Sequence, residues 1–372
     1  MEQRQFSSLK RIVVKIGSSS LIYPTGRPNL AQIENLTRQL ADLYNQGKET
    51  LLVTSGAIGM GFHRLGYARR PRTIPEKQAA AAVGQGILIH YYEKCFSEYS
   101  IPVGQVLLTR EDFADRKRFL NARNTMYTLL RMGVLPVINE NDTVAVEEIK
   151  LGDNDNLAAL VGDLVDADLL IMLSDVEGLY ESDPRLGPAR LIPEVKEITP
   201  QIEQIASGAK NGLGTGGMVT KIQAARIAMH SGMIMILAQA AEKDVVRRVM
   251  SGELLGTVFW PSARLENKKR WIAYSSIVHG KIYIDEGAVT ALLQKGKSLL
   301  PSGVTRVEGD FEMGNTVSIY SPGGNEIARG ITNFSAGEVN TIKGAKTRDI
   351  ERLLGYKSYE EVVHRNNLAL CI

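Results

Sequence analysis

The 372-residue sequence predicts an α/β fold, a three-layer sandwich with a mostly parallel central sheet, followed by a small β-rich domain. Two observations predict it. From residue 11 to about residue 260, short β-rich apolar runs alternate with longer stretches of helical periodicity, the pattern of a parallel sheet covered by helices. After residues 266–280 the chain changes to short strands and turns, which indicates a second domain.

The expected boundaries follow from that change of texture. The expected parts are a first domain at 1–265, a linker at 266–275, a β-rich domain at 276–360 and a C-terminal tail at 361–372.

Six segments are predicted as strands because they are almost continuously apolar, as strands buried on both faces are. They are 11–17, 49–56, 103–108, 133–140, 167–175 and 232–238. Long stretches between them are predicted as helices, at 30–47, 76–99 and 218–232. Because parallel strands end at the same edge of a sheet, we expect ligands to bind at their carboxyl ends.

The composition limits the classes of protein to which the chain can belong. Hydrophobic residues make up 44% and charged residues 23%, close to the globular average, which argues against a disordered or fibrous chain. The net charge of +3 is too small to indicate a nucleic-acid or membrane partner. No apolar run approaches the roughly 20 residues of a membrane span, and Cys95 and Cys371 fit a reducing compartment, so we expect a cytoplasmic protein. The five scattered histidines do not suggest a zinc site.

Four predicted strands run directly into short polar residues or glycine. Lys15 lies in the first strand and is followed by glycine and serines at 17–20, where backbone N–H groups can approach an anion. The other three strand ends carry Ser55 and Gly56; Asn139, Glu140, Asn141 and Asp142; and Ser174 and Asp175. Each end alone could be an ordinary polar turn, but four in one sheet indicate a site.

A glycine-rich loop at 211–225 opens a predicted helix that carries Thr220 and Lys221 in its first turns. Its glycines formally match G-x-G-x-x-G, but the loop follows a helical stretch and lacks a ribose-binding acid, so we reject a dinucleotide site. A phosphate site is still expected, because free N–H groups, the helix dipole and Lys221 converge there.

Residues 152–156 read GDNDN and precede an apolar run. Asp153, Asn154, Asp155 and Asn156 are typical of the cap of a helix that begins near Leu157, because their side chains accept hydrogen bonds from first-turn N–H groups. They are also typical of a recognition loop. Local chemistry leaves both interpretations open.

The candidate residues favour phosphoryl transfer, which demands positioning and charge neutralisation more than a covalent nucleophile. An acceptor that is itself a carboxylate would be ionised at neutral pH and would need no general base. Lys15 and Lys221, with Mg²⁺ on the nucleotide, would offset the repulsion between the two anions. Asp155 would hold the two ammonium groups in register.

Several motifs in the same order resemble the amino acid kinase family over nearly the whole chain. They are VVKIGSSSL, VTSGAIGMG, LLTREDFADRKRFLNARNT, PVINENDTV, EIKLGDNDNLAAL, SDVEGLYESDPR and GLGTGGMVTK. The stretch from GKIYIDEGA to NTIKG resembles a PUA domain. The resemblance implies ATP-dependent phosphorylation of the L-glutamate side-chain carboxylate, the first step of proline biosynthesis.

The resemblance also implies roles for single residues. Lys15 and Lys221 would stabilise the transferring phosphoryl group and Asp155 would organise them. Glutamate-binding positions match Ser55, Asp142 and Asn154. Nucleotide-binding positions match Lys15, Ser174, Asp175, Thr215, Gly216, Gly217, Met218, Val219, Thr220 and Lys221. Relatives often have Thr at position 174, where Ser keeps the hydroxyl group. No residue is assigned as a direct ligand of Mg²⁺.

Other readings stay open beside this one. Within the fold they are aspartokinase, acetylglutamate kinase, carbamate kinase and uridylate kinase. Because PUA domains are usually RNA-binding modules, an RNA-binding or RNA-modifying protein is a rival, and a catalytically silent proline sensor is a third possibility. The resemblance also implies feedback inhibition by L-proline and a homo-oligomer, expected to be a tetramer.

Overall fold

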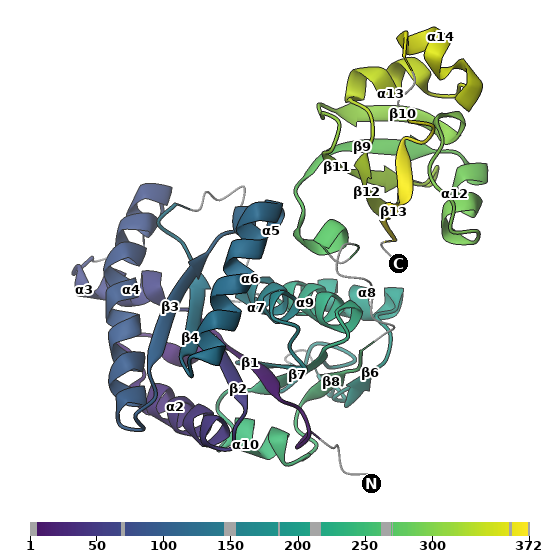
Figure 1. Ribbon diagram of the computed structural model, residues 1–372. Coiled ribbons are helices and arrows are strands. Elements are labelled where there is room, and N and C mark those ends of the chain that lie inside the picture. Colours follow the sequence, from purple (N-terminus) through teal and green to yellow (C-terminus); the bar gives the residue numbers. More distant parts are fainter. Residues whose placement is uncertain are drawn as a thin grey trace. The chain divides into compact units, whose positions relative to one another are not determined.

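The computed structural model describes residues 6–67, 71–144, 154–184, 187–208, 217–261, 269, 271–356 and 359–370. The chain divides into two compact units, shown with their elements in Figure 1. The first comprises residues 1–112 and 116–264, and the second comprises residues 113–115 and 265–372. Among the described residues, no helix combines the length and apolar character needed to span a bilayer.

The first unit is built on an eight-stranded sheet with the order β3-β4-β2-β1-β5-β7-β8-β6. Its strands are β1 (Arg11–Ile16), β2 (Glu49–Val53), β3 (Val103–Leu108), β4 (Leu135–Glu140), β5 (Leu169–Ser174), β6 (Glu194–Val195), β7 (Ile234–Gln239) and β8 (Thr257–Phe259). All neighbouring pairs are parallel except β7 and β8. The predicted fold class is confirmed. Strands β6 and β8 were not predicted because two or three residues are too few to show a periodic pattern.

Helices pack against this sheet on both faces (Figure 1). The helices between β1 and β8 are α1 (Ser18–Leu21), α2 (Leu30–Asn45), α3 (Ala57–Arg64), α4 (Ile74–Ser97), α5 (Arg110–Ala114), α6 (Arg116–Arg131), α7 (Asn154–Leu164), α8 (Pro200–Gly208), α9 (Met218–His230) and α10 (Val245–Met250). Their starts follow local chemistry. Thr73 and Glu76 form a capping box at α4, with proline in the first turn, and Asn29 accepts a hydrogen bond from the backbone of Gln32 at α2.

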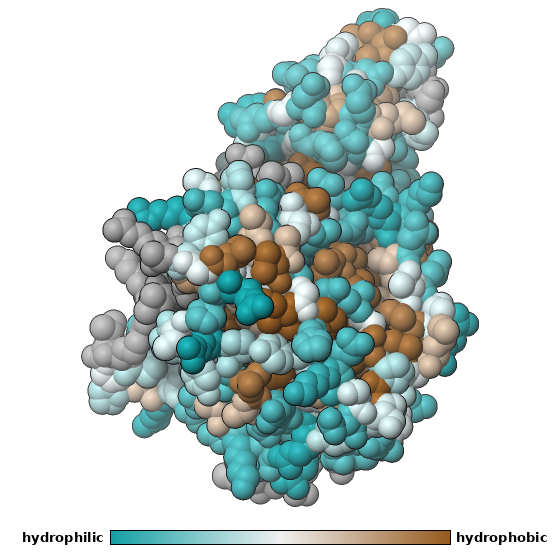
Figure 2. All heavy atoms as spheres, turned by 90° about the vertical axis from the view of Figure 1, so that its left-hand side faces the viewer, coloured by the Kyte–Doolittle hydropathy of each residue, from teal (hydrophilic) through white to brown (hydrophobic). Residues whose placement is uncertain are grey.

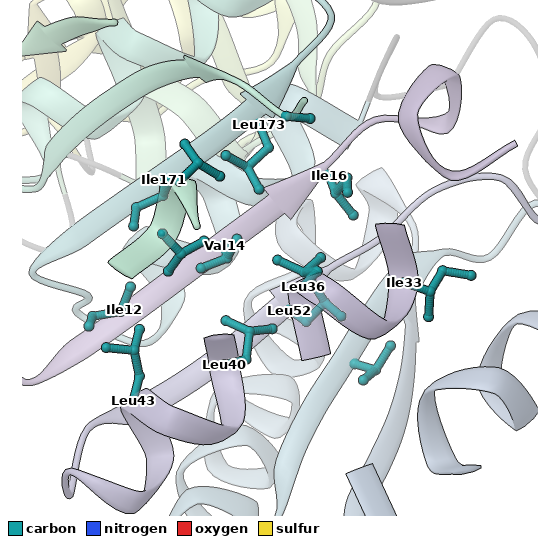
Figure 3. Close-up of a cluster of buried hydrophobic side chains, with 14 of the residues drawn as sticks. Ile12, Val14, Ile16, Ile33, Leu36, Leu40, Leu43, Leu52, Ile171 and Leu173 are labelled. Atoms are coloured by element: carbon teal, nitrogen blue, oxygen red, sulfur yellow. The ribbon is translucent and has the colours of Figure 1, made fainter. Parts of the chain in front are cut away.

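The apolar core on one face of the sheet joins α2 to β1, β2 and β5 (Figure 3). Ile12, Val14 and Ile16 alternate along β1 and contribute to this core. The buried residues of α2 recur at helical spacing, as Ile33, Leu36, Leu40 and Leu43. Because side chains alternate across a strand, Lys15 points to the opposite face, which is covered by α7 and α9.

Helices α3 and α4 approach each other closely through glycines. A Cβ atom on Gly61 would lie 1.7 Å from the carbonyl oxygen of Ala80, and one on Gly84 would lie 1.7 Å from that of Ala57. Only glycine permits such backbone contact. Figure 2 shows apolar side chains between polar ones on the molecular face that carries these helices, where Leu65 and Val83 are exposed.

The second unit has a five-stranded sheet with the order β10-β9-β11-β12-β13. Its elements are β9 (Val278–Ile284), α12 (Glu286–Leu293), β10 (Val304–Gly309), β11 (Thr316–Tyr320), β12 (Glu326–Thr332), α13 (Ala336–Ile342), α14 (Ile350–Leu354) and β13 (Val363–Leu370). The sheet and helices enclose a separate apolar core that includes Ile282, Val317, Phe334 and Val339. The predicted small β-rich domain is confirmed.

Two expected boundaries of the second unit need correction. Residues 363–370 form a strand paired with β12, whereas a tail was expected after residue 360. Residues Trp271–Ser275, expected in a linker, form a π-helical turn whose Ile272 and Ala273 pack against Ala369. The alternation of β13 is weak in sequence because four polar residues, 364–367, interrupt it.

Candidate active site

The four polar strand ends lie at one edge of the sheet. Strands β4, β2, β1 and β5 are consecutive neighbours in that order and are parallel to one another. The residues that follow these strands therefore meet at one edge, although they are spread over the sequence from residue 17 to residue 175. This is where parallel α/β sheets bind ligands.

A buried carboxylate lies between two buried lysines at this edge. Asp155 is fully buried, at 0% exposure, and Lys15 and Lys221 are 4% and 5% exposed. The Lys15 ammonium group donates to Oδ1 of Asp155, and the Lys221 ammonium group donates to Oδ2 at 3.1 Å. The three groups together carry one excess positive charge. Such a cluster is suited to an anionic ligand, because burial strengthens its electrostatic interactions.

Three elements bring this cluster together. Lys15 comes from β1, Asp155 from the first turn of α7 and Lys221 from the first turns of α9. Helices α7 and α9 pack side by side (Figure 1). The Thr220 hydroxyl group also lies 3.1 Å from Oδ2 of Asp155 and 2.7 Å from the carbonyl oxygen of Gly217. The N-terminus of α9 is thereby held against the carboxylate.

Gly217 precedes α9 as its extended N-cap residue, and Met218 and Val219 form the start of the helix. No side chain caps this end within the described residues. Its first-turn N–H groups and Lys221 suit a phosphate group. Thr215 and Gly216, also predicted to bind nucleotide, lie outside the described residues.

The Asn154 side chain joins the ends of β2 and β4. Its Nδ2 atom donates to the Thr54 carbonyl oxygen at 2.7 Å, Ser55 Oγ at 2.6 Å and Asn139 Oδ1 at 2.9 Å. These acceptors fix the orientation of the amide group. Its Oδ1 atom is buried and has no hydrogen-bond partner among the described residues. A buried acceptor of this kind is suited to a donor from a bound ligand, such as an ammonium group.

Helix α7 begins at Asn154, three residues before the predicted start near Leu157. Asn154 and Asp155 therefore occupy its first turn, and hydrogen bonds connect their side chains to β4, β1, α9 and the residues after β2. Asp153 lies outside the described residues. Only the expected start of the helix was wrong, by three residues, because side chains that are typical of a local cap find partners far away in sequence.

The remaining predicted residues lie at two other strand ends. Ser174 ends β5 and donates to Oδ1 of the exposed Asp175 at 3.0 Å. Asp142 is half-buried in the turn at 141–144 that follows β4. The assignment of Asp142 to the substrate stays a prediction.

The sequence did not identify two contributors to the site. Asn139 was noted as a strand-end residue but was given no role, and its Oδ1 atom accepts from both Asn154 and the Glu140 backbone N–H group at 2.9 Å. Thr54 contributes only its backbone carbonyl oxygen to Asn154. A side-chain pattern carries no signal for a backbone contribution.

In the described part of the chain, no group of three or more His, Cys, Asp or Glu residues is arranged to hold a metal ion. The donor set consists of ammonium, hydroxyl and N–H groups, which suit phosphate oxygens. These residues fit a nucleotide that carries its own Mg²⁺ on its phosphates.

Comparison with known proteins places this site in a family. The family model for the amino acid kinase family matches residues 10–238, which contain the buried Lys–Asp–Lys cluster. The chain belongs to the amino acid kinase family. A PUA domain model matches residues 280–354 of this amino acid kinase.

Relatives of this amino acid kinase match it over nearly their full length. The glutamate 5-kinase of Moorella thermoacetica is 53% identical over 97% of this chain and 96% of that protein. That of Caldanaerobacter subterraneus subsp. tengcongensis is 52% identical over 97% of each chain, and that of Geobacter sp. strain M21 is 48% identical over 100% of each. This family member is therefore an enzyme, a kinase, and the resemblance predicted from its sequence is confirmed.

Proposed function

We propose that this kinase transfers the γ-phosphoryl group of ATP to the side-chain carboxylate of L-glutamate, giving γ-glutamyl phosphate and ADP as the first step of L-proline biosynthesis. The near-full-length similarity to proteins named glutamate 5-kinase supports the substrate. The observation that carries the proposal is the position of Asp155 between two buried lysines, next to Asn154, whose buried oxygen lacks a partner within the described residues.

The acceptor carboxylate needs no general base, because its pKa near 4 keeps it ionised at neutral pH. One of its oxygens attacks the γ-phosphorus atom, and the bond from that atom to the oxygen bridging the β-phosphate breaks, leaving ADP. Lys15 and Lys221 would offset the repulsion between the two anions from opposite sides of Asp155. Bound with the nucleotide, Mg²⁺ would neutralise phosphate charge.

The substrates would occupy different strand ends. Ser55, Asp142 and Asn154 would bind L-glutamate, with Asn154 Oδ1 accepting a hydrogen bond from its ammonium group. Ser174, Asp175 and the first turns of α9 would bind ATP. Lys15 of the cluster lies on β1, between β2 and β5, where the two substrates would meet.

The test is formation of γ-glutamyl hydroxamate from L-glutamate, ATP, Mg²⁺ and hydroxylamine. We expect product from L-glutamate and not from L-aspartate or N-acetyl-L-glutamate, and loss of product in Lys221→Ala. A folded, ATP-binding protein that gives no product from L-glutamate would disprove the substrate assignment and favour a sibling kinase.

The proposal extends to regulation by L-proline. Because proline is the pathway product and its ammonium and carboxylate groups resemble those of the substrate, we propose inhibition at or overlapping the glutamate site. A rate that stays constant at millimolar proline would disprove this regulation without affecting the catalytic proposal.

We further propose a homo-oligomer, a tetramer. The apolar side chains exposed on the face with α3 and α4, including Leu65 and Val83, support such an assembly (Figure 2). Light scattering coupled to gel filtration would measure the mass directly, and a monomer at micromolar concentration would contradict it.

A further inference from the structure

The amide group of Asn154 is oriented by the ends of two neighbouring strands, which are joined by a backbone hydrogen bond from the Thr54 N–H group to the Ile138 carbonyl oxygen at 2.9 Å. Thr54 and Ser55, after β2, supply two of its acceptors, and Asn139, in β4, supplies the third. The orientation of Asn154 Oδ1 therefore depends on the relative position of these two ends.

Helix α4 holds both strand ends from the protein interior. The Tyr92 hydroxyl group lies 2.9 Å from the hydroxyl group of Thr54, the residue whose carbonyl oxygen accepts from Asn154. Gln85 Nε2 donates to the carbonyl oxygen of Glu140 at 3.3 Å. The backbone N–H group of Glu140 in turn donates to the side chain of Asn139.

Gln85 and Tyr92 lie on one stripe of α4, because seven residues correspond to about two helical turns. Both are buried, at 7% and 0% exposure. The next residue before Gln85 is Gly84, through which α4 contacts the α3 backbone, and α3 starts directly after Ser55 and Gly56. The stripe is thus anchored on a helix that packs closely beside the site.

We infer that Tyr92 and Gln85 are positioning residues for the amino-acid acceptor, acting through Thr54 and Glu140 on the orientation of Asn154. The inference rests on the proposed function in assigning Asn154 to the acceptor. Neither residue is a candidate substrate-binding residue, and in the described part of the chain neither forms a hydrogen bond with Ser174, Asp175 or Thr220, the candidate nucleotide residues. Their loss is therefore expected to change binding of the acceptor and not of ATP.

Burial raises the pKa of the Tyr92 phenol above its ordinary value, and the hydrogen bond with Thr54 opposes this shift. The phenol therefore keeps its proton at every working pH. The hydrogen bond between the two hydroxyl groups therefore does not depend on the pH of the reaction.

Tyr92→Phe is the test, because it removes one hydroxyl group and keeps the ring in the core. We expect the KM for L-glutamate to rise about fivefold, with the KM for ATP and the kcat within about twofold of wild type. Tyr44→Phe is the matched control. Tyr44 donates to the carbonyl oxygen of Gly133 at 2.8 Å, before the start of β4 and at the opposite end of that strand.

A second pair of variants tests the two contacts of α4 with the strand ends. Thr54→Val removes the hydroxyl partner of Tyr92, and Gln85→Leu removes the donor to Glu140. Both are expected to raise the KM for L-glutamate and to leave the KM for ATP unchanged. Thr54→Ser retains the hydroxyl group, so we expect it to keep the wild-type KM for L-glutamate. These variants decide the matter if Tyr92→Phe does not fold.

The inference is overturned if Tyr92→Phe keeps the wild-type KM for L-glutamate, if both substrates shift equally, or if Tyr44→Phe gives the same shift. The proposed substrate is tested separately on the wild-type enzyme. If that enzyme phosphorylates another amino acid, the substrate assignment fails, and the KM measurements are made with that acceptor.

Discussion

Asn154 and Asp155 are adjacent in sequence but contact opposite sides of the site. The Asn154 amide group donates to residues that end β2 and β4, whereas the Asp155 carboxylate accepts from lysines in β1 and α9. The first turn of α7 therefore links the candidate acceptor residues to the candidate phosphoryl-transfer residues. A displacement of this turn would disturb both.

Lys15→Arg is expected to lower kcat about 100-fold although it keeps the charge. Lys15 is buried against Asp155, and a guanidinium group is larger and planar, so it cannot occupy the same space with its charge at the same point. Lys243→Arg, at an exposed position, serves as the control. Retention of more than half the activity in Lys15→Arg would show that Lys15 does not act at a fixed position.

Asp155→Asn is expected to lower the free energy of unfolding by about 3 kcal/mol, because two buried ammonium groups lose their shared carboxylate. We expect ATP or sulfate to raise the melting temperature more in this variant than in wild type, since an anion would replace the lost charge. The control is Asp168→Asn, whose carboxylate accepts from the backbone of Lys10 and Arg11 at the other edge of the sheet. Equal anion effects in both variants would contradict the prediction.

Asn154→Asp is expected to raise the KM for L-glutamate at least about tenfold and to leave the KM for ATP unchanged. The substitution replaces a donor by an acceptor that faces three oxygen atoms, so the side chain must rotate or repel them. Steady-state kinetics with each substrate varied in turn measure the two KM values. Asn45→Asp, on the exposed end of α2, should leave both constants unchanged.

Gly84→Ala is expected to destabilise the first unit by about 2–3 kcal/mol or more, because the added Cβ atom would lie 1.7 Å from a backbone carbonyl oxygen of α3. Gly86→Ala, two residues along the same helix, meets nothing within 4 Å and should stabilise it by about 1 kcal/mol. Thermal or urea unfolding compares the two. If both substitutions changed the free energy of unfolding equally, the close contact between α3 and α4 would not limit the residue at position 84.

Burial lowers the pKa of His230, although its hydrogen bond to the Arg226 carbonyl oxygen opposes the shift. The unfolded state therefore binds more protons just below the ordinary pKa of 6.5, so the free energy of unfolding contributed by this group falls as pH falls through that value. We expect His230→Gln to lose less stability than wild type between pH 7.5 and pH 5.5, both values being about one unit from 6.5. Parallel melting curves would contradict this expectation.

The sequence by itself determined the six longer strands of the first sheet and the polar residues at their ends. These are local properties, because a strand buried on both faces must be apolar and a turn that approaches an anion favours small residues. The glycine loop before α9 and the family motifs were also readable from the sequence. The resemblance covered nearly the whole chain, and the family and its two-domain composition are confirmed.

Only the tertiary structure decided which of these residues meet. The order β4-β2-β1-β5 brings Lys15 to Asp155 across 140 positions of sequence and Lys221 to Asp155 across 66. It also brings Tyr92 and Gln85, two polar residues within an ordinary helical pattern, beneath the strand ends. These contacts depend on the crossover connections between strands and on close helix packing. Local periodicity cannot specify them, because it indicates which face of an element is buried and not which other element covers that face.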